Sequence, residues 1–213
     1  MTTYTKGGLV AVIADDLVRS DLNSQIGDAI DAAIEHFKSE RFYFNESRSA
    51  TFATVASQST YTVSDDADIP LFFQKDMVFV AVSATDTREV RWIPHDEMEM
   101  LIGNDPATGV PTVYSFFADS FFLNPTPDGA YTIRVPGGIE VAGPASDGET
   151  GNPWMLEAYE LIRCRAKGYV LAHIIKDLGQ AQVMSAMEES ALTQLRAKTS
   201  RKVASGRIQP TYF

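Results

Sequence analysis

The fold is decided first by residues 20–41, which read SDLNSQIGDAIDAAIEHFKSER. Apolar residues recur here every three or four positions with charged residues between them, a pattern that predicts an amphipathic α-helix. Ser20 or Asp21 can cap the free amide groups at its start. Glycine destabilises a helix interior, so Gly27 predicts a point of close packing. The preceding segment, Gly8–Leu17, adds a short helix.

The last third of the chain predicts a helical hairpin. Asn152-Pro153 supplies a capping side chain and a proline at the first helical position. The following residues are apolar around most of the helix as far as Ile175, and Gly179 is expected to end it. A second helix then runs from about Gln180 through Leu195.

The middle of the chain predicts strands. Short β-branched or aromatic runs alternate with Ser, Asp and Pro clusters, and Pro94 opens one short helix, His95–Ile102. The tight turn Ala118-Asp119-Ser120 predicts an antiparallel pair, and the whole series predicts a meander. Residues 137–151 carry five glycines and predict an exposed connection. The expected strands are Thr51–Val55, Tyr61–Val63, Met77–Val82, Glu89–Ile93, Thr112–Phe117, Phe121–Asn124 and Tyr131–Val135.

These segments predict an α+β fold, in which a helical bundle carries an inserted antiparallel β-rich region. Residues 1–45 and 152–206 form the bundle, from the N-terminal helix and the C-terminal hairpin. Residues 46–151 form the insertion, and residues 207–213 form an extended tail that Pro210 keeps from being helical.

Composition limits the classes of function. The chain has 213 residues, 45% of them apolar, and a net charge of −10, which is typical of a folded protein and disfavours tight nucleic-acid binding. It has no 18-residue apolar run, so we expect no membrane partner. The first residues lack the pattern of a signal peptide, which predicts synthesis in the cytoplasm.

No motif predicts chemistry. Phosphate-binding loops are absent, and the three histidines, His36, His95 and His173, lie far apart, so neither a nucleotide site nor a zinc site is expected. Cys164 falls in an apolar helix and is interpreted as a buried hydrophobe. The calcium-like loop from Asn124 has Val135 at the position of its closing glutamate. We therefore expect no catalytic residue, metal or cofactor. The acidic sets Asp65, Asp66, Asp68 and Asp96, Glu97, Glu99 are interpreted as solvated loop or helix-start residues.

Three Phe-Phe pairs are the unusual feature. Adjacent strand residues point to opposite faces of a sheet, so each pair places one ring on a second face that must also be covered. Either helices and loops or another subunit can cover it. The pairs are Phe72-Phe73, Phe116-Phe117 and Phe121-Phe122.

RFYFNE occupies residues 41–46, directly after the N-terminal helix, and VPTVYSFF occupies residues 110–117. With these motifs the sequence resembles the head-to-tail adaptor (connector) proteins of tailed bacteriophages. FLNPTPDGAYTIR at 122–134 and Asn152-Pro-Trp154 at the start of the hairpin are also similar to the family pattern. The sequence departs from the pattern at Val135-Pro-Gly-Gly, where the family more often continues a strand, and in its phenylalanine-rich middle. The resemblance spans roughly residues 17–200.

The resemblance implies a non-enzymatic structural protein of the virion, assembled in the host cytoplasm. It implies a homo-oligomeric ring of twelve copies that links the portal protein to tail proteins, with DNA as a passing cargo during genome ejection. We expect Phe72, Phe73, Phe117 and Phe122 at a subunit interface. We expect the tail residues Ile208, Tyr212 and Phe213 to dock on an adjacent chain or the portal. The alternative interpretation of the tail is a disordered chain end without a docking role.

Two other classes remain open. A small carbohydrate- or cation-binding α+β module could use the acidic sets and exposed aromatic rings. A hydrolase could use a pair of carboxylates such as Asp96 and Glu97.

Overall fold

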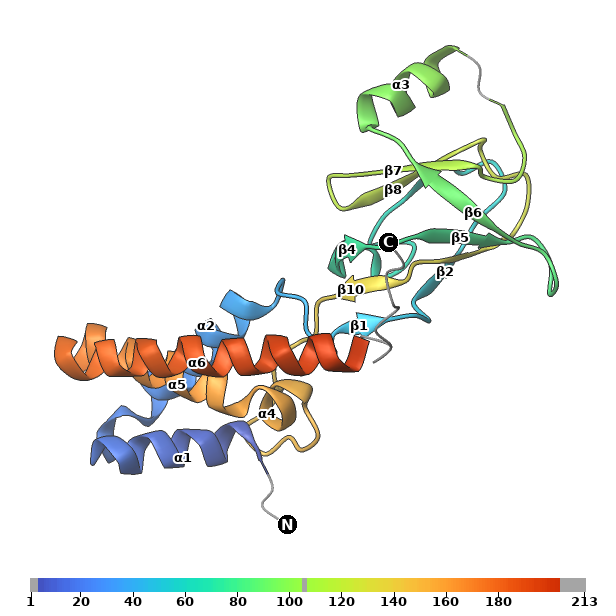
Figure 1. The fold of residues 1–213 in the computed structure, drawn as a ribbon. Coiled ribbons are helices and arrows are strands. Elements are labelled where there is room, and N and C mark those ends of the chain that lie inside the picture. Colours follow the sequence, from blue (N-terminus) through green and yellow to red (C-terminus); the bar gives the residue numbers. More distant parts are fainter. Residues whose placement is uncertain (1–3, 105–106, 204–213) are drawn as a thin grey trace, which may run out of the picture. The chain divides into compact units, whose positions relative to one another are not determined.

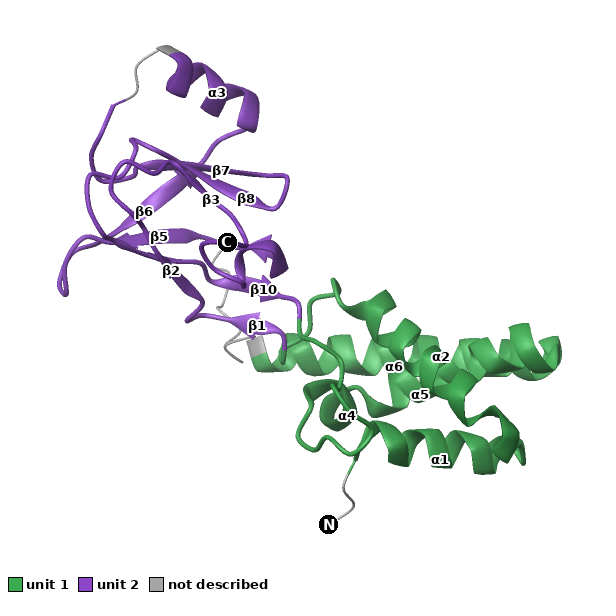
Figure 2. Ribbon diagram, turned by 180° about the vertical axis from the view of Figure 1, so that it is seen from behind, with its two compact units in different colours: residues 1–44, 141–213 green, residues 45–140 purple. Residues whose placement is uncertain are grey.

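The computed structural model describes residues 4–104 and 107–203 (Figure 1). Contacts divide the chain into two compact units, one of residues 1–44 with 141–213 and the other of residues 45–140 (Figure 2). We call them the helical unit and the β unit. All the strands and one α-helix of the described residues lie in the β unit, and the other α-helices lie in the helical unit, so the α+β class is confirmed.

The helical unit buries one apolar core among its helices. The inner face of α2 supplies Ile26, Ile30 and Ile34, as its periodicity predicts, and the helix ends at Phe37 rather than near Arg41. A 3₁₀ turn precedes α2, and no side chain caps the helix start, so the capping prediction is wrong. The helices are α1 (Lys6–Leu17), α2 (Asn23–Phe37), α4 (Pro153–Glu157), α5 (Tyr159–Val170) and α6 (Leu178–Val203).

An aromatic cluster closes this core. The ring of Trp154 meets Phe42 and Phe44 edge to face, and its Nε1 donates a hydrogen bond to the Val141 carbonyl oxygen at 2.9 Å. Asn152 caps α4 as predicted, accepting from the Trp154 amide. The RFYFNE segment therefore contributes the fully buried ring of Phe42 to the core of the helical unit, with the partly buried ring of Phe44 packed against it.

The C-terminal hairpin differs from the prediction in its break points. The expected first helix is divided at Ala158, continues as α5, and finishes in a π-helical turn, Leu171–Ile175. Lys176 adopts a left-handed backbone conformation, with φ of 64°, and the chain reverses direction there. The Asp177 carboxylate then accepts a hydrogen bond from the Gln180 amide and caps the start of α6. Gly179 consequently lies inside α6, and the prediction that it ends a helix is wrong.

Glycines mark close packing at different positions from the predicted one. A Cβ added at Gly27 would meet no atom of the described part of the chain within 4 Å, so that prediction is wrong. A Cβ at Gly168 would lie 3.3 Å from the Met184 Cβ, so α5 and α6 approach each other closely at Gly168.

The β unit holds a seven-stranded sheet in the order β2-β9-β5-β6-β7-β8-β3 and a three-stranded sheet in the order β1-β10-β4. Its core includes Tyr61, Phe121 and Leu123, all fully buried. The strands are β1 (Glu46–Ser47), β2 (Thr51–Ala53), β3 (Thr60–Tyr61), β4 (Phe72–Lys75), β5 (Val78–Ala81), β6 (Thr87–Trp92), β7 (Val113–Phe117), β8 (Ser120–Asn124), β9 (Thr132–Arg134) and β10 (Gly137–Ile139).

The β7–β8 hairpin is confirmed, with Ala118 and Asp119 both at positive φ in its turn. The meander is only partly correct, because β6 and β7 are parallel. Helix α3 (His95–Asn104) follows β6 and returns the chain to the start of β7, as a parallel pair requires.

The glycine-rich segment after Val135 is not wholly an exposed connection. Gly137 and Gly138 begin β10, which pairs with both β1 and β4. A Cβ at Gly137 would collide with the Gln74 carbonyl group, and one at Gly138 with the Phe73 ring. Glycine is needed at these two positions because the neighbouring strand approaches so closely. In the sequence alone, such glycines cannot be distinguished from the glycines of a loop.

Candidate functional site

The predicted interface phenylalanines divide into buried and accessible rings. Phe72 is 4% exposed and packs against Phe121, so it offers almost no surface to a neighbouring subunit. Phe73 is half-buried and covers Gly138, and Phe122 is half-buried on β8. Phe117 is 56% exposed. The subunit interface itself stays a prediction, and the accessible rings among the four predicted phenylalanines are those of Phe73, Phe117 and Phe122.

Helix α3 covers part of the second face of the sheet. The His95 ring stacks on Phe117 with a centroid separation of 4.5 Å and lies 4.6 Å from Phe122. We call His95, Phe117 and Phe122 the aromatic patch. Nδ1 of His95 is buried and has no hydrogen-bond partner among the residues that the structure describes, and its Nε2 lies 3.4 Å from the Glu99 carboxylate. Helix α3 therefore covers the aromatic rings on this face of the sheet only in part, since Phe117 stays accessible to solvent.

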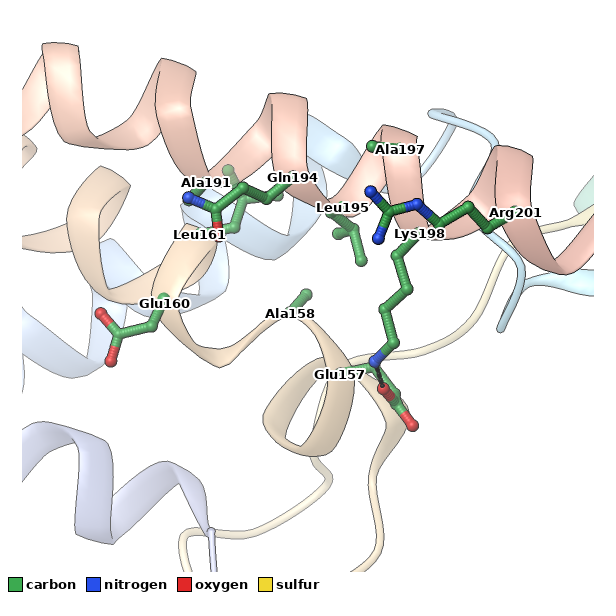
Figure 3. A pocket seen from close by; sticks show the side chains of 10 residues that line it. All are labelled: Glu157, Ala158, Glu160, Leu161, Ala191, Gln194, Leu195, Ala197, Lys198 and Arg201. Atoms are coloured by element: carbon green, nitrogen blue, oxygen red, sulfur yellow. Dashed lines mark hydrogen bonds and ion pairs between the residues drawn. The ribbon is translucent and has the colours of Figure 1, made fainter.

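The helical unit contains a second candidate surface, a cleft of about 420 Å³ between α6 and the α4–α5 segment (Figure 3). We call it the helical cleft. Leu161, Ala191 and Leu195 contribute apolar surface to it, and Gln194 of α6 contributes a polar side chain near Ala191 (Figure 3). Its charged lining residues are Glu157, Glu160, Lys198 and Arg201.

One carboxylate of the helical cleft is fully engaged. Lys198 Nζ lies 2.6 Å from the Glu157 carboxylate, which also accepts a hydrogen bond from the Tyr43 hydroxyl. These hydrogen bonds, the one from Lys198 first, lower the pKa of Glu157, whereas burial and then the bond to Glu157 raise the pKa of Tyr43. Lys202 Nζ lies 3.6 Å from the centroid of the Tyr43 ring. This group attaches the end of α6 to the segment after α2.

The charge of the chain is strongly uneven. Residues 45–140 hold 14 acidic and 5 basic side chains, a net charge of −9. The remaining residues hold 14 acidic and 13 basic side chains, a net charge of −1. Nearly all of the excess negative charge therefore belongs to the β unit.

The acidic sets have structural roles in the described residues. Asp65 accepts hydrogen bonds from the Thr62 amide and the Gln58 side chain, both at 2.7 Å. Asp96 and Glu97 occupy the first turn of α3, where the helix dipole favours negative charge. Within residues 4–104 and 107–203, no group of three or more His, Cys, Asp or Glu side chains could hold a metal ion. Burial raises the pKa of the Cys164 thiol, which opposes formation of a reactive thiolate.

The predicted docking residues of the tail, Ile208, Tyr212 and Phe213, lie outside the described residues. Sequence reasoning missed the helical cleft, because its walls come from residues 157–161 and 191–201, whose contact depends on the reversal at Lys176. The available signal was the basic end of α6, where Lys198, Arg201 and Lys202 follow one another closely.

Comparison with known proteins adds a family. A family model described as "SU10 adaptor protein" matches residues 3–211, nearly the whole chain. No curated protein matches the chain. Among the helices that the structure describes, none has both the length and the apolar character needed to cross a membrane.

Proposed function

We propose that this chain, which belongs to the SU10 adaptor protein family of phage head-to-tail adaptors, forms a ring that joins the portal to the tail and surrounds the DNA channel. Membership makes it a structural protein of the phage virion. Beyond this membership, we propose that the ring contains twelve copies and surrounds the genome as it leaves the capsid. We assign no catalytic step to the chain.

The observation that carries the proposal is the aromatic patch. A closed ring repeats one heterologous contact, so each subunit needs two different adhesive surfaces. Phe117 remains 56% exposed although α3 packs on the same face, which supports a neighbour as its missing cover. The helical cleft provides a second surface of different chemistry.

The charge distribution supports the place around DNA. A channel must let DNA slide, and a strongly acidic surface repels phosphates instead of binding them. The β unit, with its net charge of −9, is the part of the chain best suited to face the moving genome.

The test is the mass of the purified full-length chain in solution, alone and with portal particles. We expect large rings, formed by the chain alone or on the portal. A chain that stays single at every concentration and ignores the portal would refute the proposal. Thermal stabilisation of such a single chain by a sugar or a cation would favour the ligand-binding alternative.

A matched pair of variants tests the aromatic patch. Phe117→Ser should weaken ring assembly, because it removes an exposed ring from the proposed contact. Val63→Ser removes a similarly exposed apolar side chain, 59% exposed against 56%, from elsewhere in the β unit and should leave assembly unchanged. Equal effects of the two variants would contradict the assignment of the patch.

A further inference from the structure

The second face of the seven-stranded sheet is covered only in part within the chain. Helix α3 contacts β7 and β8 (Figure 1), where Val113 and Phe117 point to this face. Strand pairing places Arg91 of β6 beside Val113, so the same face continues over β6, β5, β9 and β2, where it stays exposed. We call this remainder the open sheet face, and its residues are Thr51, Phe79, Glu89, Arg91, Thr132 and Arg134. All of them are exposed except Phe79, which is half-buried.

The open sheet face is cationic although it belongs to an acidic unit. The β unit has a net charge of −9 and five basic side chains, and two of these, Arg91 and Arg134, lie on this face with one acidic residue, Glu89. The Arg91 side chain makes no hydrogen bond or ion pair with any residue that the structure describes. The Arg134 guanidinium group lies over the Phe79 ring, 4.9 Å from its centroid. Stacking of this kind orients a guanidinium group and leaves its N–H groups free to bind a carboxylate.

The side of α3 that points away from its own sheet has the matching chemistry. Met98 is fully buried and His95 packs on the aromatic rings of the sheet, so these two residues mark the inner side of the helix. The opposite side carries two carboxylates in the first turn of the helix and two apolar side chains in the next turn, 67% and 41% exposed. We call this side the outer face of α3, and its residues are Asp96, Glu97, Met100 and Leu101.

We propose that the open sheet face binds the outer face of α3 from a second copy of the chain. The two carboxylates of the helix pair with the two arginines of the sheet. Met100 and Leu101 pack on the Phe79 ring and on the small side chains beside it. The contact lies next to the aromatic patch, because the same face of the sheet carries both. The inference rests on the proposed ring, which brings a second copy alongside.

Charge identifies the partner as the β unit of a second copy. Two units that each carry a charge of −9 repel one another wherever acidic surfaces meet. At the open sheet face the sign is reversed, so an acidic element of a neighbour is attracted there. The chain's own α3 is held on β7 and β8 with its carboxylates turned away, whereas a neighbour's α3 can lie beside it and extend the helical layer over the sheet. The two surfaces differ, so the contact is heterologous, as a ring requires.

The experiment uses two charge-reversed forms of the full-length chain. The face variant combines Arg91→Glu with Arg134→Glu, and the helix variant combines Asp96→Arg with Glu97→Arg. Their masses in solution are measured over a concentration series, alone and with portal particles, and circular dichroism shows that each is folded. For each variant we expect the concentration at half-assembly to rise about tenfold or more, because every contact now brings like charges together. Assembly of both variants at the concentration of the unchanged chain would overturn the proposal.

An equimolar mixture of the two variants gives the decisive result. When the variants alternate around a ring, every contact again joins opposite charges, and a ring of twelve copies permits this alternation throughout. We therefore expect the mixture to assemble within about threefold of the concentration that the unchanged chain needs. A mixture of folded variants that stays dissociated would overturn the proposal. Loss of assembly in the face variant alone would assign the arginines to another partner, such as DNA, and would also overturn it.

A matched control separates this contact from a general effect of charge. Arg48→Glu with Arg88→Glu makes the same change in net charge within the β unit, but neither residue belongs to the open sheet face, and Arg88 is paired with Asp86 at 2.6 Å. We expect this control to assemble within about twofold of the unchanged chain. A loss equal to that of the face variant would overturn the assignment of the face.

The mass measurement also separates this inference from the proposed function. Rings that form normally from both variants would refute the contact between α3 and the open sheet face and leave the adaptor ring intact. An unchanged chain that never forms rings, alone or with portal particles, would instead refute the ring and with it this contact.

Discussion

Gly27 and Gly168 both lie inside helices, and they should respond in different ways to the same substitution. Alanine is favoured over glycine in a helix interior by about 1 kcal/mol. At Gly27 the new methyl group enters open space, so Gly27→Ala should stabilise the chain by about that amount. For a protein of this size, the melting temperature should rise by about 2–4 °C.

At Gly168 the new methyl group lies 3.3 Å from the Met184 Cβ, and α5 and α6 must separate to admit it. Overpacking typically costs about 1–3 kcal/mol, which cancels or exceeds the gain in helix propensity. We therefore expect Gly168→Ala to be neutral or to destabilise the chain by up to about 2 kcal/mol.

The assay is guanidinium unfolding followed by circular dichroism at 222 nm, where the helical unit dominates the signal. The midpoint should rise for Gly27→Ala and stay or fall for Gly168→Ala, with the slope unchanged. A fall for Gly27→Ala, or equal rises for both variants, would refute the reasoning from packing.

Three further outcomes follow from individual contacts. Gly138→Ala should destabilise the β unit by more than about 1 kcal/mol, the typical cost of overpacking a core, because its Cβ would collide with the Phe73 ring. An unchanged melting temperature would contradict this. The Asp16 carboxylate lies 2.6 Å from Arg163 and has a lowered pKa, mainly through that hydrogen bond, so its contribution to stability is present above its ordinary pKa and is lost as the pH falls through the folded value. The melting temperature of Asp16→Asn should thus lie below that of the unchanged chain at pH 7, with the gap closing toward pH 2; a gap that is constant with pH would exclude the ion pair as its cause. Cys164 should react with a thiol reagent only after unfolding, and rapid labelling of the native chain would show that the thiol is accessible.

The helical cleft and the aromatic patch differ in chemistry. The cleft combines the apolar side chains of Leu161, Ala191 and Leu195 with charged ones, among them the Glu157 carboxylate, which is paired with Lys198 and accepts a hydrogen bond from the Tyr43 hydroxyl. The aromatic patch of the β unit has the opposite character, since rings dominate it and its one titratable group is His95. Two surfaces of such different chemistry allow a heterologous contact without favouring a symmetric pair of chains.

Local patterns in the sequence were sufficient for the elements whose signals act over a few residues. The amphipathic period of α2, the Asn152 cap and the Ala118-Asp119 turn each depend on neighbouring residues, and each is present. The α+β class follows from the order of these elements. The family resemblance was also visible in the sequence, because its motifs RFYFNE and NPW lie directly beside helices that local patterns predict, and the family match confirms it.

Tertiary structure alone decided what depends on contacts between distant residues. The parallel β6–β7 pair, the role of Gly137 and Gly138 in β10, and the open space at Gly27 each depend on which backbone lies alongside. The helical cleft likewise exists only because the reversal at Lys176 sets α6 against the α4–α5 segment. Periodicity and capping describe a residue's own helix or strand, whereas close approach and clefts are properties of pairs of elements, which a linear pattern does not encode.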